Sequence, residues 1–254
     1  MGANHQVFPE ALGVSTSVAT DAEEVRSLCA SAASLKILDT RISACRACPR
    51  LVAWREEVAV RKRRAFVGEE YWARPVVGFG PSDAQIVIVG LAPAAHGGNR
   101  TGRIFTGDES GNWLFASLHR VGLAKTATSV SASDGQELLN TRMIAAVRCA
   151  PPANAPTTIE RDTCRPWLSR ELTLLSNAQV YVALGAFAWD ALLATLKVIP
   201  KPKPRFSHGA RVELTDGRIL LASYHPSQQN TYTRRLTEAM LDGVLGSAAS
   251  LANQ

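Results

Sequence analysis

The sequence predicts a three-layer α/β/α sandwich around a mostly parallel central sheet. Three short apolar runs rich in β-branched residues, at 85–89, 143–147 and 179–184, have the length and composition of buried strands. A segment with helical spacing of apolar residues follows each run. Strands that alternate with helices are typical of a parallel sheet covered by helices on both faces. A chain of 254 residues is long enough for one such domain with a short appendage.

The chain is predicted to consist of an N-terminal extension, residues 1–34, and one domain, residues 35–254. Residues 1–19 are small and polar without periodicity, so we expect part of the extension to be mobile. Thr20 and Glu23 then form a capping-box pattern, which predicts that a helix begins there.

The other elements are predicted from apolar spacing, caps and turn residues. Proline is tolerated in the first turn of a helix, because its missing N–H would have no partner there. Asp-Gly between two apolar runs is typical of a β-hairpin turn. The sequence therefore predicts a helical stripe over 35–45, a helix from Pro49, a helix over 112–121, a capping box at Thr157 and Glu160, a helix over 186–196, a hairpin of 211–214 and 218–222 around Asp216 and Gly217, and a final helix after Arg235.

The chain carries a formal net charge of +6, which favours an anionic partner. Nucleic acid is the commonest such partner, although an ordinary basic enzyme can carry the same charge. The basic run at 61–64 is either a solvated face or a phosphate contact. No apolar run approaches membrane-spanning length and no secretory signal opens the chain, so we expect a cytoplasmic protein that does not engage a membrane.

A glycine-rich segment at 90–111 connects the first predicted strand to the helix that follows it. It is longer than the usual connection in an α/β domain, which favours a functional segment over a plain surface loop. Ligands of open α/β sheets bind beyond the carboxyl ends of the strands, where this segment lies. Its polar candidates are His96, Asn99, Arg100, Arg103 and Asp108.

Four cysteines are candidate metal ligands. Cys45 and Cys48 form a C-x-x-C pair, and Cys149 and Cys164 follow about a hundred residues later at element boundaries. Thiolates without histidines suit either a tetrahedral zinc ion or an iron–sulfur cluster, and four unrelated core thiols are the structural alternative. Cys29, on the first predicted helix, is interpreted as a small buried hydrophobic residue.

A second polar motif, His225-Pro226-Ser227, comes directly after the last predicted strand. The carboxyl ends of parallel strands meet at one edge of a sheet, so this motif is predicted to lie near the glycine-rich segment. A histidine at such a place is a candidate for acid–base or hydrogen-bonding chemistry.

These motifs resemble those of family 5 of the uracil-DNA glycosylase superfamily, its b branch. Residues 90–108 are similar to the first motif of that branch nearly throughout, 148–154 to an intervening motif, and 225–227 to the second motif. The four cysteines match the ligands of the family's 4Fe-4S cluster. The resemblance covers roughly residues 35 to 245 and implies a glycosylase-like α/β/α fold.

The resemblance also implies roles for individual residues. Asp108 would stabilise the cationic sugar and orient the attacking water. His225 would donate a hydrogen bond to the base O2, and Asn154 would assist the positioning of water or of the base. Phe105 matches the aromatic residue on which the flipped base stacks. The remaining implied contacts are Gly90, Ala92 and His96 beside the base, and Arg100, Arg103, Ser227, Arg234 and Arg235 beside the DNA.

The implied activity is that of a monofunctional DNA glycosylase acting in base excision repair. Such an enzyme removes uracil from double-stranded DNA and leaves an abasic site, with the 4Fe-4S cluster in a structural role. Leu91 and Ala145 stand where the sister family 4 carries polar residues, which predicts that hypoxanthine and other deaminated bases are accepted as well. We expect a monomer that associates with the nucleoid through its DNA substrate.

Two other classes of protein fit some of these features. A lesion-binding protein with a structural metal and little turnover would share the DNA contacts and the cysteines. A metal-dependent nuclease is disfavoured, because no cluster of carboxylates accompanies the glycine-rich segment.

Overall fold

The computed structural model describes residues 17–196 and 202–253. A mostly parallel sheet of five strands forms its centre, in the order β2-β1-β3-β5-β4. Most of the segment 1–19, for which we expected mobility, lies outside the described residues. The strands are β1 (Ile86–Gly90), β2 (Thr141–Ala145), β3 (Val180–Leu184), β4 (Arg211–Glu213) and β5 (Ile219–Ser223), and the short edge strand β4 runs antiparallel to β5.

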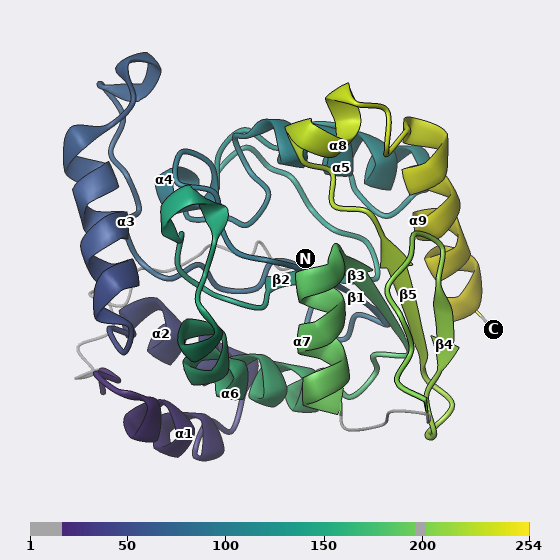
Figure 1. The fold of residues 1–254 in the computed structure, drawn as a ribbon, viewed down its shortest axis with the longest axis horizontal. Helices are drawn as coiled ribbons and strands as arrows, with labels where there is room; N and C mark the ends of the chain where they lie inside the picture. Colours follow the sequence, from purple (N-terminus) through teal and green to yellow (C-terminus); the bar gives the residue numbers. More distant parts are fainter. Residues whose placement is uncertain (1–16, 197–201, 254) are drawn as a thin grey trace.

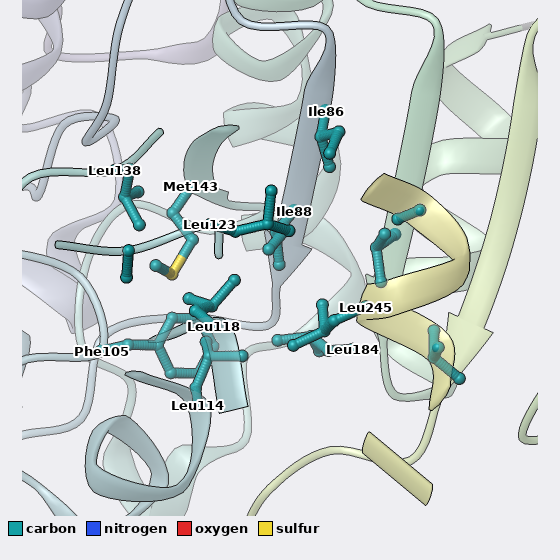
Figure 2. Packing of buried hydrophobic residues seen from close by; sticks show 14 of the residues in the cluster. Ile86, Ile88, Phe105, Leu114, Leu118, Leu123, Leu138, Met143, Leu184 and Leu245 are labelled. Atoms are coloured by element: carbon teal, nitrogen blue, oxygen red, sulfur yellow. The ribbon is translucent and has the colours of Figure 1, made fainter. Parts of the chain in front are cut away.

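Helices cover both faces of the sheet, as Figure 1 shows. Alternate residues of β1 point to opposite faces, because side chains alternate along a strand. Ile86 and Ile88 pack with α5 (Glu109–Arg120) and α9 (Glu238–Ala252) on one face, and Figure 2 shows part of this cluster. Val87 and Val89 pack on the other face with α6 (Thr158–Leu174) and α7 (Ala186–Leu196). The predicted three-layer α/β/α fold is therefore confirmed.

Three helices at the N-terminal side contribute to a third core cluster around Trp167. They are α1 (Ala22–Ala30), α2 (Leu35–Ala44) and α3 (Pro49–Arg61). Two of them, α1 and α2, pack against α6. The short helices are α4 (Gly98–Thr101), α8 (Gln228–Tyr232) and the 3-10 turns η2 (Arg64–Phe66) and η3 (Pro152–Asn154). No helix in the described part of the chain combines the length and apolar character needed to cross a bilayer.

Several predicted boundaries differ from the structure: the second strand is Thr141–Ala145 and not 143–147, and two helix starts are changed by their caps. The cap of α1 is Asp21, which accepts from the amides of Glu23 and Glu24 at 2.8 and 2.9 Å, so the proposed Thr20–Glu23 capping box is wrong. Thr20 instead donates to the Glu24 carboxylate, one residue further along. The helix predicted from 112 begins at Glu109, because the cap is supplied by Asp108. The capping box at Thr157 and Glu160 and the hairpin of β4 and β5 are confirmed.

Candidate active site and cysteine cluster

Asp108 lies where the glycine-rich segment meets α5. Its Oδ1 accepts from the Gly111 amide at 2.9 Å, so the side chain does cap the helix. Its other oxygen, Oδ2, lies against Gly97, where an added Cβ would stand only 1.9 Å away. Burial raises the pKa of Asp108, while the Gly111 amide and the Arg100 charge oppose the rise. Helix capping therefore uses Oδ1 of Asp108, while Oδ2 faces the glycine-rich segment.

Phe105 contacts two other predicted site residues. Its ring lies against Gly90, where a Cβ would approach Cζ to 2.7 Å, and its centroid is 5.8 Å from that of His225. The two rings are tilted by 35°. The backbone of Phe105 has a φ of 51°, a left-handed conformation that is strained for an aromatic residue. Such strain is concentrated at functional sites, where the surrounding structure holds it.

His225 follows β5 and reaches the same edge of the sheet as the segment after β1. Burial lowers the pKa of His225 to about 4, so its imidazole is neutral at physiological pH. The backbone of the turn is held by Asn230, whose Nδ2 donates to the His225 carbonyl at 2.9 Å. A neutral imidazole carries one N–H, so His225 can donate a hydrogen bond to an acceptor placed beside Phe105.

The other residues expected around the base lie in different surroundings. Asn154 is exposed in the turn η3 after β2, with a left-handed φ of 54°. His96 is half-buried, and its Nδ1 is 3.0 Å from the Tyr71 hydroxyl. Ala92 packs against the core cluster that contains Cys149. The structure thus brings the Phe105 ring against both Gly90 and His225.

Arg100 is not positioned to contact phosphate. Only 8% of the residue is exposed, and its guanidinium pairs with the Glu69 carboxylate and donates to the Gly107 carbonyl at 2.9 Å. Its Nε donates to the His96 carbonyl at 2.8 Å, and Phe66 stacks on the cation at 3.9 Å. These contacts fix the conformation of the glycine-rich segment. Arg100 therefore has a structural role in place of the expected DNA contact.

The same correction applies to Arg103, which is 2% exposed. Its guanidinium pairs with Asp134 at 2.6 Å and donates to the hydroxyls of Thr106 and Ser129 at 3.0 and 2.7 Å. A sequence pattern cannot distinguish such an arginine from a phosphate ligand, because both stand in glycine-rich polar segments. The carboxylate partners come from segments distant along the chain, and only the fold brings them together.

The remaining predicted DNA contacts are accessible. Arg234 and Arg235 are exposed after α8, and Arg235 lies over the Tyr224 ring at 4.6 Å. Ser227 is the residue before α8, and its hydroxyl makes no capping bond there. Figure 1 shows α4, α5 and α8 on one side of the molecule, at the edge where the parallel strands end.

All four predicted cysteine ligands line one cavity: Cys45, Cys48, Cys149 and Cys164. They come from the end of α2, the start of α3, the segment after β2 and the middle of α6. Burial raises the pKa values of the thiols, to about 12 for Cys48 and about 11 for Cys149. In the described part of the chain, no group of three or more His, Cys, Asp or Glu side chains is arranged around a single metal position.

Arg55 is a residue of this region that the sequence reasoning missed. It lies on α3, is 2% exposed, and donates through Nη1 to the Cys149 Sγ at 3.0 Å. The available signal was its spacing, because Arg55 stands at a helical interval from Leu51 and Val58 on the apolar face of α3. Cys29 is buried in the same core cluster, as expected for a small hydrophobic residue.

Comparison with known proteins shows the family that the chain resembles. Residues 77–247 match the model of the uracil DNA glycosylase superfamily. The chain is 54% identical over 211 residues to a type-5 uracil-DNA glycosylase of Thermus thermophilus, covering 83% of this chain and 95% of that protein. It is 55% identical over 222 residues to a type-5 enzyme of Mycobacterium leprae, covering 87% of this chain and 97% of that protein. A type-4 enzyme of Thermotoga maritima is 28% identical over 195 residues, which is 76% of this chain and 81% of that protein.

Proposed function

Because the chain belongs to the uracil DNA glycosylase superfamily, and within it to the type-5 family, we propose that it excises uracil from double-stranded DNA and leaves an abasic site. As a member of this family it is an enzyme, a hydrolase that acts on N-glycosyl bonds. The proposed excision of uracil from duplex DNA depends mainly on one observation, the contact between Phe105 and His225 at the carboxyl edge of the sheet. Phe105 stands three residues before Asp108 in the sequence.

The chemistry requires opposite charges to be stabilised on the two sides of one bond. Cleavage of an N-glycosidic bond leaves positive charge on the sugar and negative charge on the departing base. Asp108 supplies the carboxylate for the sugar and for orienting water, and neutral His225 donates an N–H to the base oxygen where negative charge collects. Preorganised groups of this kind are often the largest single contribution to catalysis.

The base itself is held by stacking. An enzyme that cleaves a base from duplex DNA must rotate the nucleotide out of the helix into a pocket. The Phe105 ring provides an apolar face there, and it lies against Gly90 at the end of β1. We propose that Asn154, which is exposed after β2, assists the positioning of water or of the base.

We propose that substrate choice is broad. Ala145 ends β2 and is 2% exposed, and half-buried Leu91 follows β1, so neither of these positions offers a polar group to the base. A pocket without a dedicated hydrogen-bonding partner rejects a base with an altered pattern only weakly. Hypoxanthine, with a different pattern of donors and acceptors, is therefore proposed as a second substrate.

One set of incubations tests both proposals. Duplexes that contain a single uracil or a single hypoxanthine are treated with excess enzyme and then with alkali, beside the corresponding single strands. Alkali-dependent cleavage of both duplexes supports a glycosylase with a broad pocket. A mobility shift without cleavage would indicate a lesion-binding protein, and cleavage before alkali would indicate a nuclease. Excision of uracil with hypoxanthine untouched would contradict the broad pocket alone.

We propose that Cys45, Cys48, Cys149 and Cys164 hold a structural 4Fe-4S cluster. Support comes from the donor set, because four sulfurs without a histidine line one cavity. When bound, such a cluster would join α2 and α3 to the end of β2 and to α6. Anaerobically purified protein should be brown and contain about four irons per chain, as the cluster type requires. Colourless protein with one zinc ion would contradict the assignment.

A further inference from the structure

Arg55 joins the cysteine cavity to the glycine-rich segment. Its guanidinium donates to the Cys149 Sγ at 3.0 Å and to the Cys45 carbonyl at 3.1 Å, so it contacts two of the four cysteine residues. Its own carbonyl accepts from Asn99 Nδ2 at 3.2 Å, and Asn99 is fully buried in α4. Arg55 is therefore held in place by both its backbone and its side chain.

Other arginines near this cavity have carboxylate partners. Arg148 and Arg142 are buried and share Glu171, at 2.5 and 2.7 Å. Arg142 also pairs with Asp39 at 3.2 Å. The half-exposed Arg50 of α3 pairs with the buried Glu160 through two hydrogen bonds, at 2.8 and 2.7 Å. These pairs place a carboxylate beside each guanidinium, which is the usual condition for burying an ion.

Arg55 differs, because it has no ion pair with a carboxylate in the part of the chain that the structure describes. Its neighbour Glu56 is taken by Arg46, at 3.1 Å through Nη2. The Arg55 Nε is buried and has no hydrogen-bond partner among residues 17–196 and 202–253. An isolated buried cation is strongly unfavourable, so the site requires an anion. The nearest side chain that it contacts is a cysteine, which is neutral as a thiol and negative as a thiolate.

We propose that Arg55 is the counter-charge of the 4Fe-4S cluster. Four thiolates give such a cluster a net negative charge, and Arg55 donates directly to one of the four sulfurs. Hydrogen bonds to the sulfurs and nearby charges set the reduction potential of a cluster. A fixed positive charge favours the more negative, reduced state, so Arg55 raises the potential and stabilises the bound cluster. This inference rests on the proposed cofactor and adds a residue that the cysteine motif does not contain.

The test compares Arg55→Met and Arg55→Lys with wild-type protein, all purified anaerobically. Met removes the charge and keeps an unbranched side chain, whereas Lys keeps the charge and loses the planar fork. Arg61→Met is the matched control, because Arg61 lies on the same helix with a side chain that is 76% exposed. Iron content, the visible band and the midpoint potential of the one-electron couple, from voltammetry, are measured for each protein.

The wild type, the Lys variant and the Arg61 control should retain iron and similar potentials. The Met variant should either lose iron or retain it with a midpoint potential lowered by about 59 mV or more, which is a tenfold change for a one-electron couple. Wild-type iron and potential in Arg55→Met would overturn the proposal. Loss of iron in both Arg55 variants would also overturn the proposal. Lys keeps the positive charge, so a role that Lys cannot restore depends on the shape of the guanidinium and not on its charge. Wild-type protein without iron would refute the cofactor itself.

Discussion

At the residue scale, Asp108 combines a helix cap with a proposed catalytic charge, and Asp108→Asn separates the two. Asparagine caps a helix as well as aspartate does, so the fold should be kept. The charge is lost, so excision should slow by at least ~100-fold. Because burial raises the folded-state pKa of Asp108, ionising it costs stability as pH rises through that pKa. The variant should therefore melt at the same or a higher temperature at neutral pH.

Single-turnover rates and thermal melts of Asp108→Asn check this prediction. Glu109→Gln is the control, because Glu109 is the neighbouring carboxylate in the first turn of α5 and is not expected to face the sugar. Near wild-type excision by Asp108→Asn would show that the carboxylate acts only as a cap. The catalytic role would then move to Asn154 or His96.

His225 should act as a neutral donor, and its effect on stability should depend on pH. Its folded-state pKa, about 4, lies below the ordinary value of 6.5, so the unfolded chain binds more protons between those two values. The contribution of neutral His225 to stability is therefore present above about pH 6.5 and is lost as pH falls toward 4. His225→Ala should show a smaller decrease in melting temperature between pH 7 and pH 5 than the wild type.

The rate of uracil excision should also depend on His225. His225→Ala should excise uracil ~100-fold more slowly, as expected for the loss of one donor to a developing anion. The wild-type single-turnover rate should show no step near pH 6.5, because the imidazole is already neutral on both sides of that value. A clear titration near pH 6.5 that disappears in His225→Ala would contradict the assignment.

At the element scale, the helix α8 and the residues after it should form part of the DNA-binding face. Arg234 and Arg235 are exposed there, whereas Arg100 and Arg103 are buried. Each lost phosphate contact should flatten the plot of log affinity against log salt by roughly 0.9. Arg234→Ala with Arg235→Ala should therefore lower the slope for uracil-free duplex by about 1.8 in total, if both bind phosphate.

Fluorescence anisotropy across a salt series measures that slope. Arg165→Ala is the control, because Arg165 lies on α6, which Figure 1 shows on the side of the molecule away from α8. An unchanged slope in the double variant, with the control also unchanged, would exclude this face. The exposed run at 61–64 would then be the next candidate, since it extends from the end of α3.

At the scale of the whole molecule, the cysteine cavity connects the N-terminal helices to the main sheet. The third core cluster joins α1, α2 and α3 to α6, and its cysteines come from both sides of that junction. Removal of iron with a chelator should lower the melting temperature by more than about 4 °C, which for a domain of this size corresponds to about 1 kcal/mol or more. Backbone amide exchange should increase first in α2 and α3.

Calorimetry and hydrogen exchange on the loaded and chelated protein test this expectation. The sheet strands β1 and β3 serve as the internal control, because they are buried in the other two clusters. Equal melting temperatures and equal exchange in α2 and α3 would show that the cavity carries no structural cofactor. A uniform loss of protection in all strands would show instead that the cluster supports the whole domain.

The local sequence determined the elements and the motifs of this protein. Alternating strands and helices, the Asp-Gly hairpin and the Thr157 cap depend on neighbours within a few residues, so short-range patterns predict them. The resemblance of 90–108 and 225–227 to a known family could likewise be recognised from residues alone. Even the convergence of motifs at one edge of the sheet follows from strand direction, since the carboxyl ends of parallel strands share an edge.

The tertiary structure decided which arginine side chains are exposed to a partner and which form contacts inside the protein. Arg100 and Arg103 look like phosphate ligands in the sequence, but Glu69 and Asp134 approach them from segments about thirty residues away. Arg55 stands on the apolar face of α3 by its spacing, but its partner Cys149 lies 94 positions further along the chain. The physical reason is the same in each case. Long-range pairing sets the state of a buried charged group, and its distant partner is not encoded by its local neighbours.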